Sequence, residues 1–295
     1  MKTYRYLEPA ALARVRNLKL VARSVVEGFV SGLHSSPFKG FSSEFSEHRN
    51  YVPGDNLRSL DWRVLARTDR YYIKEYEEET NLAAHILLDV SGSMGYGSGE
   101  VTKFEYGCYL AAMLSYLLIR QRDSVGLVLF DEAVRLRMPA RSTTRHLNEM
   151  LRQLENCRPG APTQLAGLFH TLAESFKRRC LIIIISDLYD DPEAVLRALH
   201  HFRHKKHEVI LYHVLDKAEL ELNFDQTVNL TDMETDERLQ IDPAVVRNDY
   251  QNRIGEFIDT YRRACRRSRV DYLTTDTEVP YDLMLSAYLD KRAML

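Results

Sequence analysis

Oxygen-bearing side chains follow two strongly apolar runs of the sequence, and another begins a helical stretch between them. Asp89, Ser91 and Ser93 come directly after the run HILL, and Asp187 follows the run LIIII. Thr163 precedes an amphipathic stretch between these two runs. The loops hold neither Cys nor His, so their donors suit Mg²⁺, Mn²⁺ or Ca²⁺ rather than zinc. These five residues are therefore candidate ligands of a hard divalent cation, with Mg²⁺ as the first choice.

The spacing of the first three candidates supports a common target. In an extended loop, side chains two positions apart point the same way, which applies to Asp89, Ser91 and Ser93. Gly92 and Gly95 are expected to let the backbone wrap closely around an ion. Two carboxylates neutralise a divalent cation. Five side chains, some acting through water, would leave at least one octahedral position for an outside ligand.

Other interpretations of the same residues remain open. Asp and Ser after a strand commonly cap helices, and Thr163 could cap the helix that follows it. Enzyme signatures are incomplete: Ser98 and Gly99 stand where a phosphate-binding loop needs Lys and Ser or Thr. Ser91 replaces the second Asp of a haloacid-dehalogenase-type phosphatase, and no G-x-S-x-G elbow is present. The alternative is a divalent-metal-dependent hydrolase or phosphotransferase, for which Asp216 is the best further carboxylate to act as a base.

A regular alternation of elements must position these side chains. Short apolar runs at 81–90, 124–130, 180–188 and 207–216 alternate with amphipathic stretches at 103–121, 143–156, 163–178 and 191–205. This pattern predicts an α/β fold with a doubly wound, mainly parallel sheet buried under helices on both faces. In such a sheet, ligands bind at the carboxyl ends of the strands, where the candidate residues stand.

Less regular segments flank this pattern. The sequence predicts a helix over 9–30, short strands and turns over 31–80, and a polar connection with a short hairpin over 217–242. A long helix over 243–268, an edge strand over 270–275 and a helix from Pro280 follow. We therefore expect two parts: a lead-in segment at 1–80, and an α/β domain with C-terminal helices at 81–295.

Composition excludes several classes of protein. The 295 residues are 45% hydrophobic and 28% charged, which is typical of a globular chain rather than a disordered one. Forty Lys and Arg against 42 Asp and Glu give a net charge of −2, so we expect no nucleic-acid partner. The four cysteines form no CxxC pair, and no apolar run approaches the roughly 20 residues of a membrane span. We expect a cytoplasmic protein with reduced thiols.

The oxygen donors also match a known motif. Asp89-x-Ser91-x-Ser93, then Thr163, then Asp187, in this order on strand ends, resembles the metal-ion-dependent adhesion site of von Willebrand factor A-like domains. The resemblance covers about residues 81–275. It implies that Asp89, Ser91, Ser93 and Thr163 form the metal shell and that Asp187 acts through a water. It further implies that a protein partner's Asp or Glu fills the open position.

The preceding segment resembles a second signature, that of the bacterial family called domain of unknown function 58 (DUF58). The matching residues are Glu44–Phe45, Arg49–Asp55, Arg58, Asp61–Arg63, Ala66–Arg67 and Lys74–Glu75. In that family this block directly precedes a von Willebrand A-like domain. The resemblance implies a non-enzymatic adaptor that works with a MoxR-type AAA+ ATPase in assembling or remodelling a protein complex. Structural ion pairs within the 49–67 block are the alternative to a direct binding role there.

Overall fold

The computed structural model describes residues 19, 21–23, 25–27, 48–50, 72–74, 83–160, 162, 164–224, 226–231 and 238–293. The chain divides into two units, one of Met1–Phe29 with Leu82–Leu295 and one of Val30–Asn81. In the second unit, the described residues form the short antiparallel pair β1 (His48–Asn50) and β2 (Tyr72–Lys74). Most of the predicted 49–67 block, from Tyr51 onward, lies outside the described residues.

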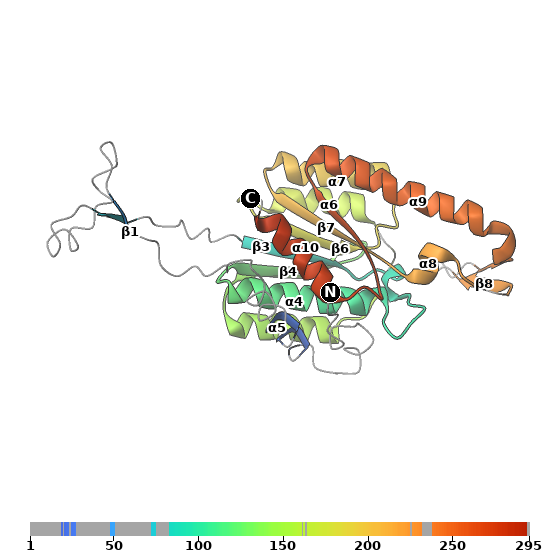
Figure 1. Ribbon diagram of the computed structural model, residues 1–295, viewed down its shortest axis with the longest axis horizontal. Coiled ribbons are helices and arrows are strands. Elements are labelled where there is room, and N and C mark those ends of the chain that lie inside the picture. The colour runs from blue at the N-terminus through green and yellow to red at the C-terminus, as the bar shows by residue number, and fades with distance from the viewer. Residues whose placement is uncertain are drawn as a thin grey trace. The chain divides into compact units, whose positions relative to one another are not determined.

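The larger unit is built on a six-stranded sheet in the order β10-β7-β6-β3-β4-β5 (Figure 1). Its strands are β3 (Ala83–Asp89), β4 (Ser124–Phe130), β5 (Val134–Arg141), β6 (Leu181–Ser186), β7 (Glu208–Leu215) and β10 (Asp271–Asp276). All neighbouring pairs run parallel except β4 with β5. The predicted mainly parallel α/β sheet is therefore confirmed.

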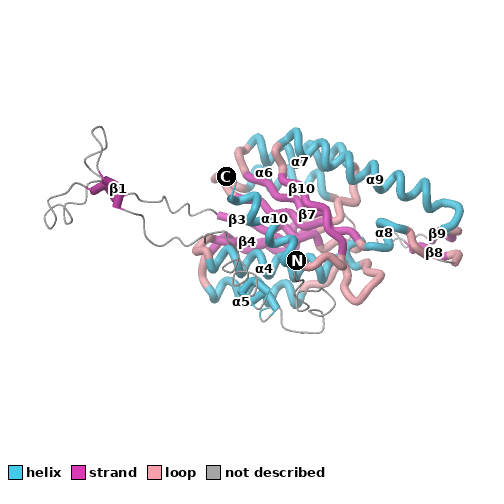
Figure 2. The backbone as a smooth tube through the Cα atoms, viewed as in Figure 1, coloured by secondary structure: helices cyan, strands magenta, loops and turns pink. Residues whose placement is uncertain are grey.

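Helices cover both faces of this sheet (Figure 2). On one face α6 (Leu165–Ser175), α7 (Pro192–His204) and α9 (Pro243–Ser268) pack together, and on the other α4 (Lys103–Arg120) packs with α5 (Thr144–Asn156) and α10 (Tyr281–Ala293). Because β3 leads to α4 and β6 leads to α7, neighbouring strands send their chains to opposite faces. The sheet is doubly wound, as expected from the sequence.

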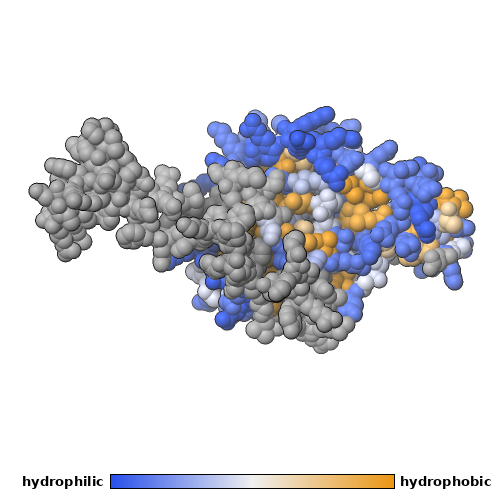
Figure 3. Space-filling model, viewed as in Figure 1, coloured by the Kyte–Doolittle hydropathy of each residue, from blue (hydrophilic) through white to orange (hydrophobic). Residues whose placement is uncertain are grey.

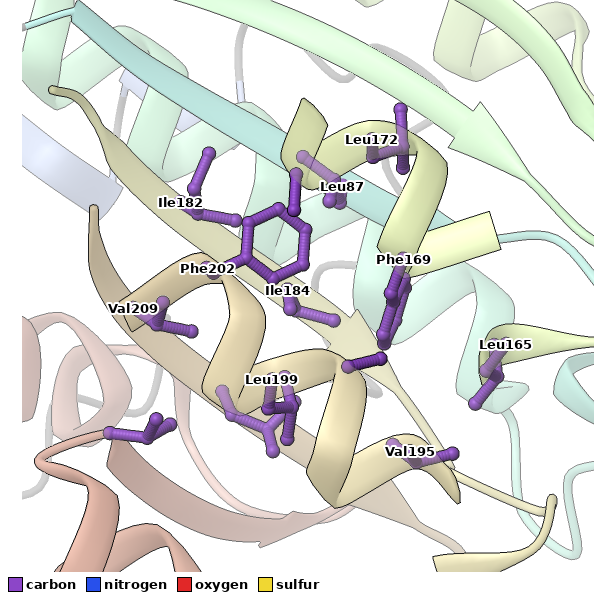
Figure 4. Packing of buried hydrophobic residues seen from close by; sticks show 14 of the residues in the cluster. Leu87, Leu165, Phe169, Leu172, Ile182, Ile184, Val195, Leu199, Phe202 and Val209 are labelled. Atoms are coloured by element: carbon purple, nitrogen blue, oxygen red, sulfur yellow. The ribbon is translucent and has the colours of Figure 1, made fainter. Parts of the chain in front are cut away.

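The core lies between the sheet and the helices. Every residue of β6 is buried, because its alternating side chains face a helical layer on each side. Figure 4 shows Ile182 and Ile184 against Phe169 of α6 and Leu199 and Phe202 of α7. Full burial of each such side chain stabilises the fold by about 1.5–3 kcal/mol. This packing holds the carboxyl ends of the strands in fixed positions.

The described residues of the predicted 9–30 helix belong to the same unit. Residues 21–23 and 25–27 are helical, and Val21, Ala22, Val25 and Val26 are buried. The Tyr116 hydroxyl of α4 donates to Glu27 Oε1 at 3.1 Å. Within the described part of the chain, no helix is both long and apolar enough to cross a membrane.

A small projecting element follows β7. The short helix α8 (Lys217–Glu221) precedes the antiparallel hairpin of β8 (Val228–Thr231) and β9 (Arg238–Ile241), which was predicted within 217–242. Leu230 and Leu239 face each other across this hairpin, and both are exposed, as is Val245 at the start of α9. Figure 3 shows hydrophobic residues gathered at this end of the molecule.

Candidate metal centre

The candidate site lies where the order of strands in the sheet reverses. Chain order runs from β3 outward through β4 and β5, then restarts on the other side of β3 with β6 and continues outward through β7 and β10. A crevice opens at the carboxyl ends of the strands at such a switch point, here between β3 and β6. Asp89 ends β3, and Ser186 ends β6 with Asp187 directly after it. The topology therefore brings these two stretches together, although almost 100 residues separate them.

Asp89 is fully buried and held by two hydrogen bonds. The Ser91 amide donates to Oδ1 at 2.9 Å, and the Ser186 hydroxyl donates to Oδ2 at 2.6 Å. Burial and the nearby charge of Asp187 raise the pKa of Asp89 to about 7, against the opposing effect of these hydrogen bonds. The Asp89 carboxylate is therefore fixed in place, and its negative charge is disfavoured while Asp187 is ionised.

The two candidate serines lie side by side after Asp89. Ser91 Oγ and Ser93 Oγ are 3.1 Å apart, with Ser91 buried and Ser93 half-buried. Ser93 begins the short 3-10 helix η2 (Ser93–Gly95). Gly92 has φ −58° and ψ −41°, a conformation open to every residue type. The close approach of the backbone to an ion at Gly92 therefore stays a prediction, while the predicted grouping of the two serine side chains is observed.

The third stretch runs beside the first. The Gly160 amide donates to the Val90 carbonyl at 3.1 Å, while Thr163 itself lies outside the described residues. The helix α6 begins at Leu165 with Gln164 at its N-cap, and the Leu165 amide donates to Asp190 Oδ2 at 2.8 Å. Gln164 makes no side-chain cap bond, and Asp190 Oδ2 accepts from the Leu165 and Ala166 amides at the start of α6 instead.

Asp187 pairs with a residue that the sequence analysis missed. Its Oδ2 lies 2.8 Å from Nζ of Lys103, and neither side chain is exposed to solvent. The same ammonium lies 2.6 Å from Glu219 Oε1 on α8. Burial acts to lower the pKa of Lys103, but Asp187 and Glu219 outweigh it and hold that pKa above its ordinary value. The site thus contains a built-in cation.

Lys103 stands at an unusual place for a positive charge. It is the first residue of α4, directly after the N-cap Thr102, which forms a capping box with Glu105. The amino end of a helix carries partial positive charge and favours anions. A lysine at the first position of a well-capped predicted helix is therefore a signal in the sequence that could have identified Lys103 as a candidate site residue.

The charges of the site do not balance among the described residues. Asp89, Asp187 and Glu219 contribute three negative charges when ionised, and Lys103 contributes one positive charge, which leaves −2 in a buried region. A divalent cation would neutralise this excess, and the carboxylates and hydroxyls supply the hard oxygen donors that Mg²⁺ prefers. No group of three or more His, Cys, Asp or Glu able to hold a metal occurs among the described residues. A metal here would therefore depend on hydroxyls and outside ligands as well.

Asp216, the residue considered as the base of a hydrolase, has a structural role as a helix cap. It is buried and caps α8 by accepting from the Ala218 amide at 2.9 Å. The Ser98 amide and the Thr277 hydroxyl also donate to it, at 3.0 and 3.2 Å. Burial raises the pKa of Asp216, but these hydrogen bonds more than offset that and leave it below its ordinary value. A carboxylate so occupied is poorly placed to accept a proton from a substrate.

These features define a class of protein. A doubly wound, mainly parallel sheet with one antiparallel edge strand, and oxygen-bearing side chains at its switch point, make this an α/β domain with a candidate metal centre at its strand ends. Residues 47–256 match the family described as "Protein of unknown function DUF58", and the chain belongs to that family.

Relatives of the chain are themselves described only as uncharacterized. It is 30% identical over 249 residues to the uncharacterized protein Rv1480 of Mycobacterium tuberculosis (strain ATCC 25618 / H37Rv), covering 82% of this chain and 77% of the relative. It is 29% identical over 129 residues to the uncharacterized protein YeaD of Bacillus subtilis (strain 168), covering 43% of this chain and 30% of YeaD.

Two solved structures share the fold. One is the conserved hypothetical protein BatB from Bacteroides thetaiotaomicron, with a TM-score of 0.50 and 16% identity. The other is an aerotolerance-related membrane protein from Bacteroides fragilis NCTC 9343, with a TM-score of 0.52 and 14% identity. Each likeness covers 72% of this chain and all of the solved chain. At these identities the likeness shows the fold alone.

Proposed function

We propose that this protein is a non-enzymatic interaction module that binds its partner through a divalent cation, with Mg²⁺ as the natural ion. The supporting observation is the set of three carboxylates against one ammonium at the switch point, which leaves an excess of two negative charges when all are ionised, beside the hydroxyls of Ser91 and Ser93. Asp89, Ser91, Ser93, Thr163 and Asp187 would hold the ion. A partner's Asp or Glu would complete its coordination, and the surrounding surface would supply specificity.

The partner that family resemblance suggests is a MoxR-type AAA+ ATPase, with this protein as the adaptor to another complex in the cytoplasm. The exposed Leu230, Leu239 and Val245 lie on elements that continue from α8, which contacts the site through Glu219. A partner seated over the carboxyl ends of the strands would have apolar surface within reach at this end of the molecule. The hydrolase or phosphotransferase alternative is less favoured, because Asp216 is occupied as a helix cap.

Metal binding is tested most cleanly at Ser93. Among the described residues its hydroxyl hydrogen-bonds with that of Ser91, so Ser93→Ala should fold normally. Mn²⁺ is used as a substitute for Mg²⁺ and is titrated into the protein by calorimetry. We expect it to bind the wild type at one site. We expect Ser93→Ala to weaken that binding about tenfold. Ser175→Ala, which removes a hydroxyl on α6 bonded to the Leu172 carbonyl, is the matched control.

Partner binding is tested by capturing a purified MoxR-type AAA+ ATPase with this protein, in Mg²⁺ and in EDTA. Capture should fail in EDTA and in Ser93→Ala, and persist in Ser175→Ala. Absence of saturable Mn²⁺ binding to the wild type would refute the metal site. Equal capture in Mg²⁺ and EDTA would refute metal bridging. Phosphoester hydrolysis that requires Mg²⁺ and Asp216 would instead establish the enzyme alternative.

A further inference from the structure

The buried ammonium of Lys103 is shared between two carboxylates on different parts of the chain. Asp187 follows β6 and Glu219 belongs to α8, and the two distances to Nζ are 2.8 and 2.6 Å. Lys103 also lies 4.8 Å from the ring centre of Tyr189, a second contact that stabilises a cation there. This lysine is therefore held by the fold rather than placed by chance at a surface.

Asp187 is at once a predicted metal ligand and a partner of Lys103. A divalent cation near Asp187 would be repelled by the ammonium, and the repulsion would be strong because buried charges are poorly screened by water and salt. Glu219 opposes this effect, because it offers Lys103 a second carboxylate and adds a negative charge near the site. The charge at Lys103 and the charge at Glu219 therefore act on a bound metal in opposite directions.

We infer that Lys103 is an internal competitor for the metal at Asp187, and that Lys103 and Glu219 together set how tightly the site holds a divalent cation. This inference rests on the proposed metal site. With Lys103 the three carboxylates Asp89, Asp187 and Glu219 keep two uncompensated charges when all are ionised. Without Lys103 they would have three, and without Glu219 only one. Metal affinity should follow this order.

Glu219 also connects the site to the projecting end of the molecule. The Tyr250 hydroxyl of α9 donates to the Glu219 carbonyl at 2.6 Å, and Gln251 Nε2 donates to the Glu221 carbonyl at 2.9 Å. Arg247 donates to the carbonyls of Leu222 and Phe224 at 3.2 and 2.9 Å. Glu219 is thus on a helix that is hydrogen-bonded to α9. These bonds help to hold the Glu219 carboxylate at its distance from Lys103.

The test is Mn²⁺ titration of four proteins: the wild type, Lys103→Met, Glu219→Gln and Lys205→Met. Lys103→Met should bind Mn²⁺ at least about tenfold more tightly than the wild type, and Glu219→Gln at least about tenfold more weakly. Lys205, the C-cap residue of α7, pairs with the exposed Glu174 of α6, so its variant should leave Mn²⁺ affinity unchanged. Thermal unfolding with and without Mg²⁺ is the second measurement, and Mg²⁺ should raise the Tm of Lys103→Met more than that of the wild type.

Lys103→Met leaves buried carboxylates without their cation, so it is to be purified in Mg²⁺. Should it fail to fold, Glu219→Gln alone decides, because glutamine keeps the shape and an acceptor for Lys103. Unchanged or tighter Mn²⁺ binding by Glu219→Gln would overturn the inference, as would unchanged or weaker binding by Lys103→Met. Each result is distinct from failure of the proposed function, in which the wild type itself binds no Mn²⁺.

Discussion

Gly107 on α4 allows the helix to lie close to the two central strands just before the candidate site. A Cβ at this position would be 2.8 Å from Leu88 Cδ1 and 3.3 Å from Ile185 Cγ2. Carbon atoms in ordinary contact are about 3.5–4.0 Å apart. Leu88 and Ile185 are fully buried, so neither can move without disturbing packed neighbours. We expect this crowding in Gly107→Ala to cost about 1–3 kcal/mol of unfolding free energy.

A second term has the opposite sign. Alanine in a helix interior is more favourable than glycine by about 0.5–1 kcal/mol, because glycine loses more backbone entropy on folding. Gly255 of α9 isolates this term, since a Cβ there would meet nothing within 4 Å. Gly255→Ala should therefore be more stable than the wild type. Gly107→Ala should be less stable than Gly255→Ala by about 1–3 kcal/mol, which is the packing cost.

Urea unfolding of the three proteins measures these differences, provided that the dependence on urea concentration keeps the same slope. Leu88 and Ile185 directly precede Asp89 and Ser186, so Gly107→Ala should also weaken Mn²⁺ binding while Gly255→Ala should not. Equal stability of the two variants would refute the argument that α4 is positioned by contact at Gly107.

Two further predictions concern acid stability and thiol reactivity. Burial lowers the pKa of His85 to about 4, so the unfolded chain binds a proton that the native protein excludes, and stability should fall as the pH drops from about 6.5 to 4. The loss of unfolding free energy approaches about 1.4 kcal/mol per pH unit. Urea unfolding at pH 7 and pH 5 should show a smaller loss of unfolding free energy in His85→Gln than in the wild type. An equal loss in both proteins would contradict the assignment to His85. Iodoacetamide at pH 8 should modify one thiol per native molecule, at the half-exposed Cys157, and four after unfolding, because the other three are buried. Mass spectrometry reads the count, and native labelling that persists in Cys157→Ala would contradict it.

The elements predicted from the sequence were those with strong periodic patterns. The helix predicted at 243–268 is observed at those bounds, and the one predicted at 143–156 begins one residue later. The strand β5 was missed because it is an antiparallel edge strand with no continuous apolar run. Its only sign is the alternation of Val134, Leu136 and Met138 with polar residues and a proline.

The candidate site divides in the same way. Asp89, Ser91, Ser93 and Asp187 follow from the rule that ligands gather at strand ends, and the structure places all four at the switch point, while their role as metal ligands stays a prediction. The pairing of Lys103 with Asp187 and Glu219 could not be inferred, because 84 and 116 positions separate the lysine from these two carboxylates. Pairings over such distances depend on how the elements pack, which periodicity does not reveal.

The length of α9 has a mechanical consequence. Its 26 residues span about 39 Å at 1.5 Å per residue, whereas the sheet strands of six to eight residues span only about 20–27 Å. Tyr261 and Cys265 anchor its second half in the core, while its first half extends beyond the sheet (Figure 1). The helix is therefore a lever: a tilt of about 5° at the anchored end displaces the far end by about 3 Å. Because Arg247, Tyr250 and Gln251 of this first half bond to α8 and to the segment just after it, such a tilt would displace α8 and the hairpin together.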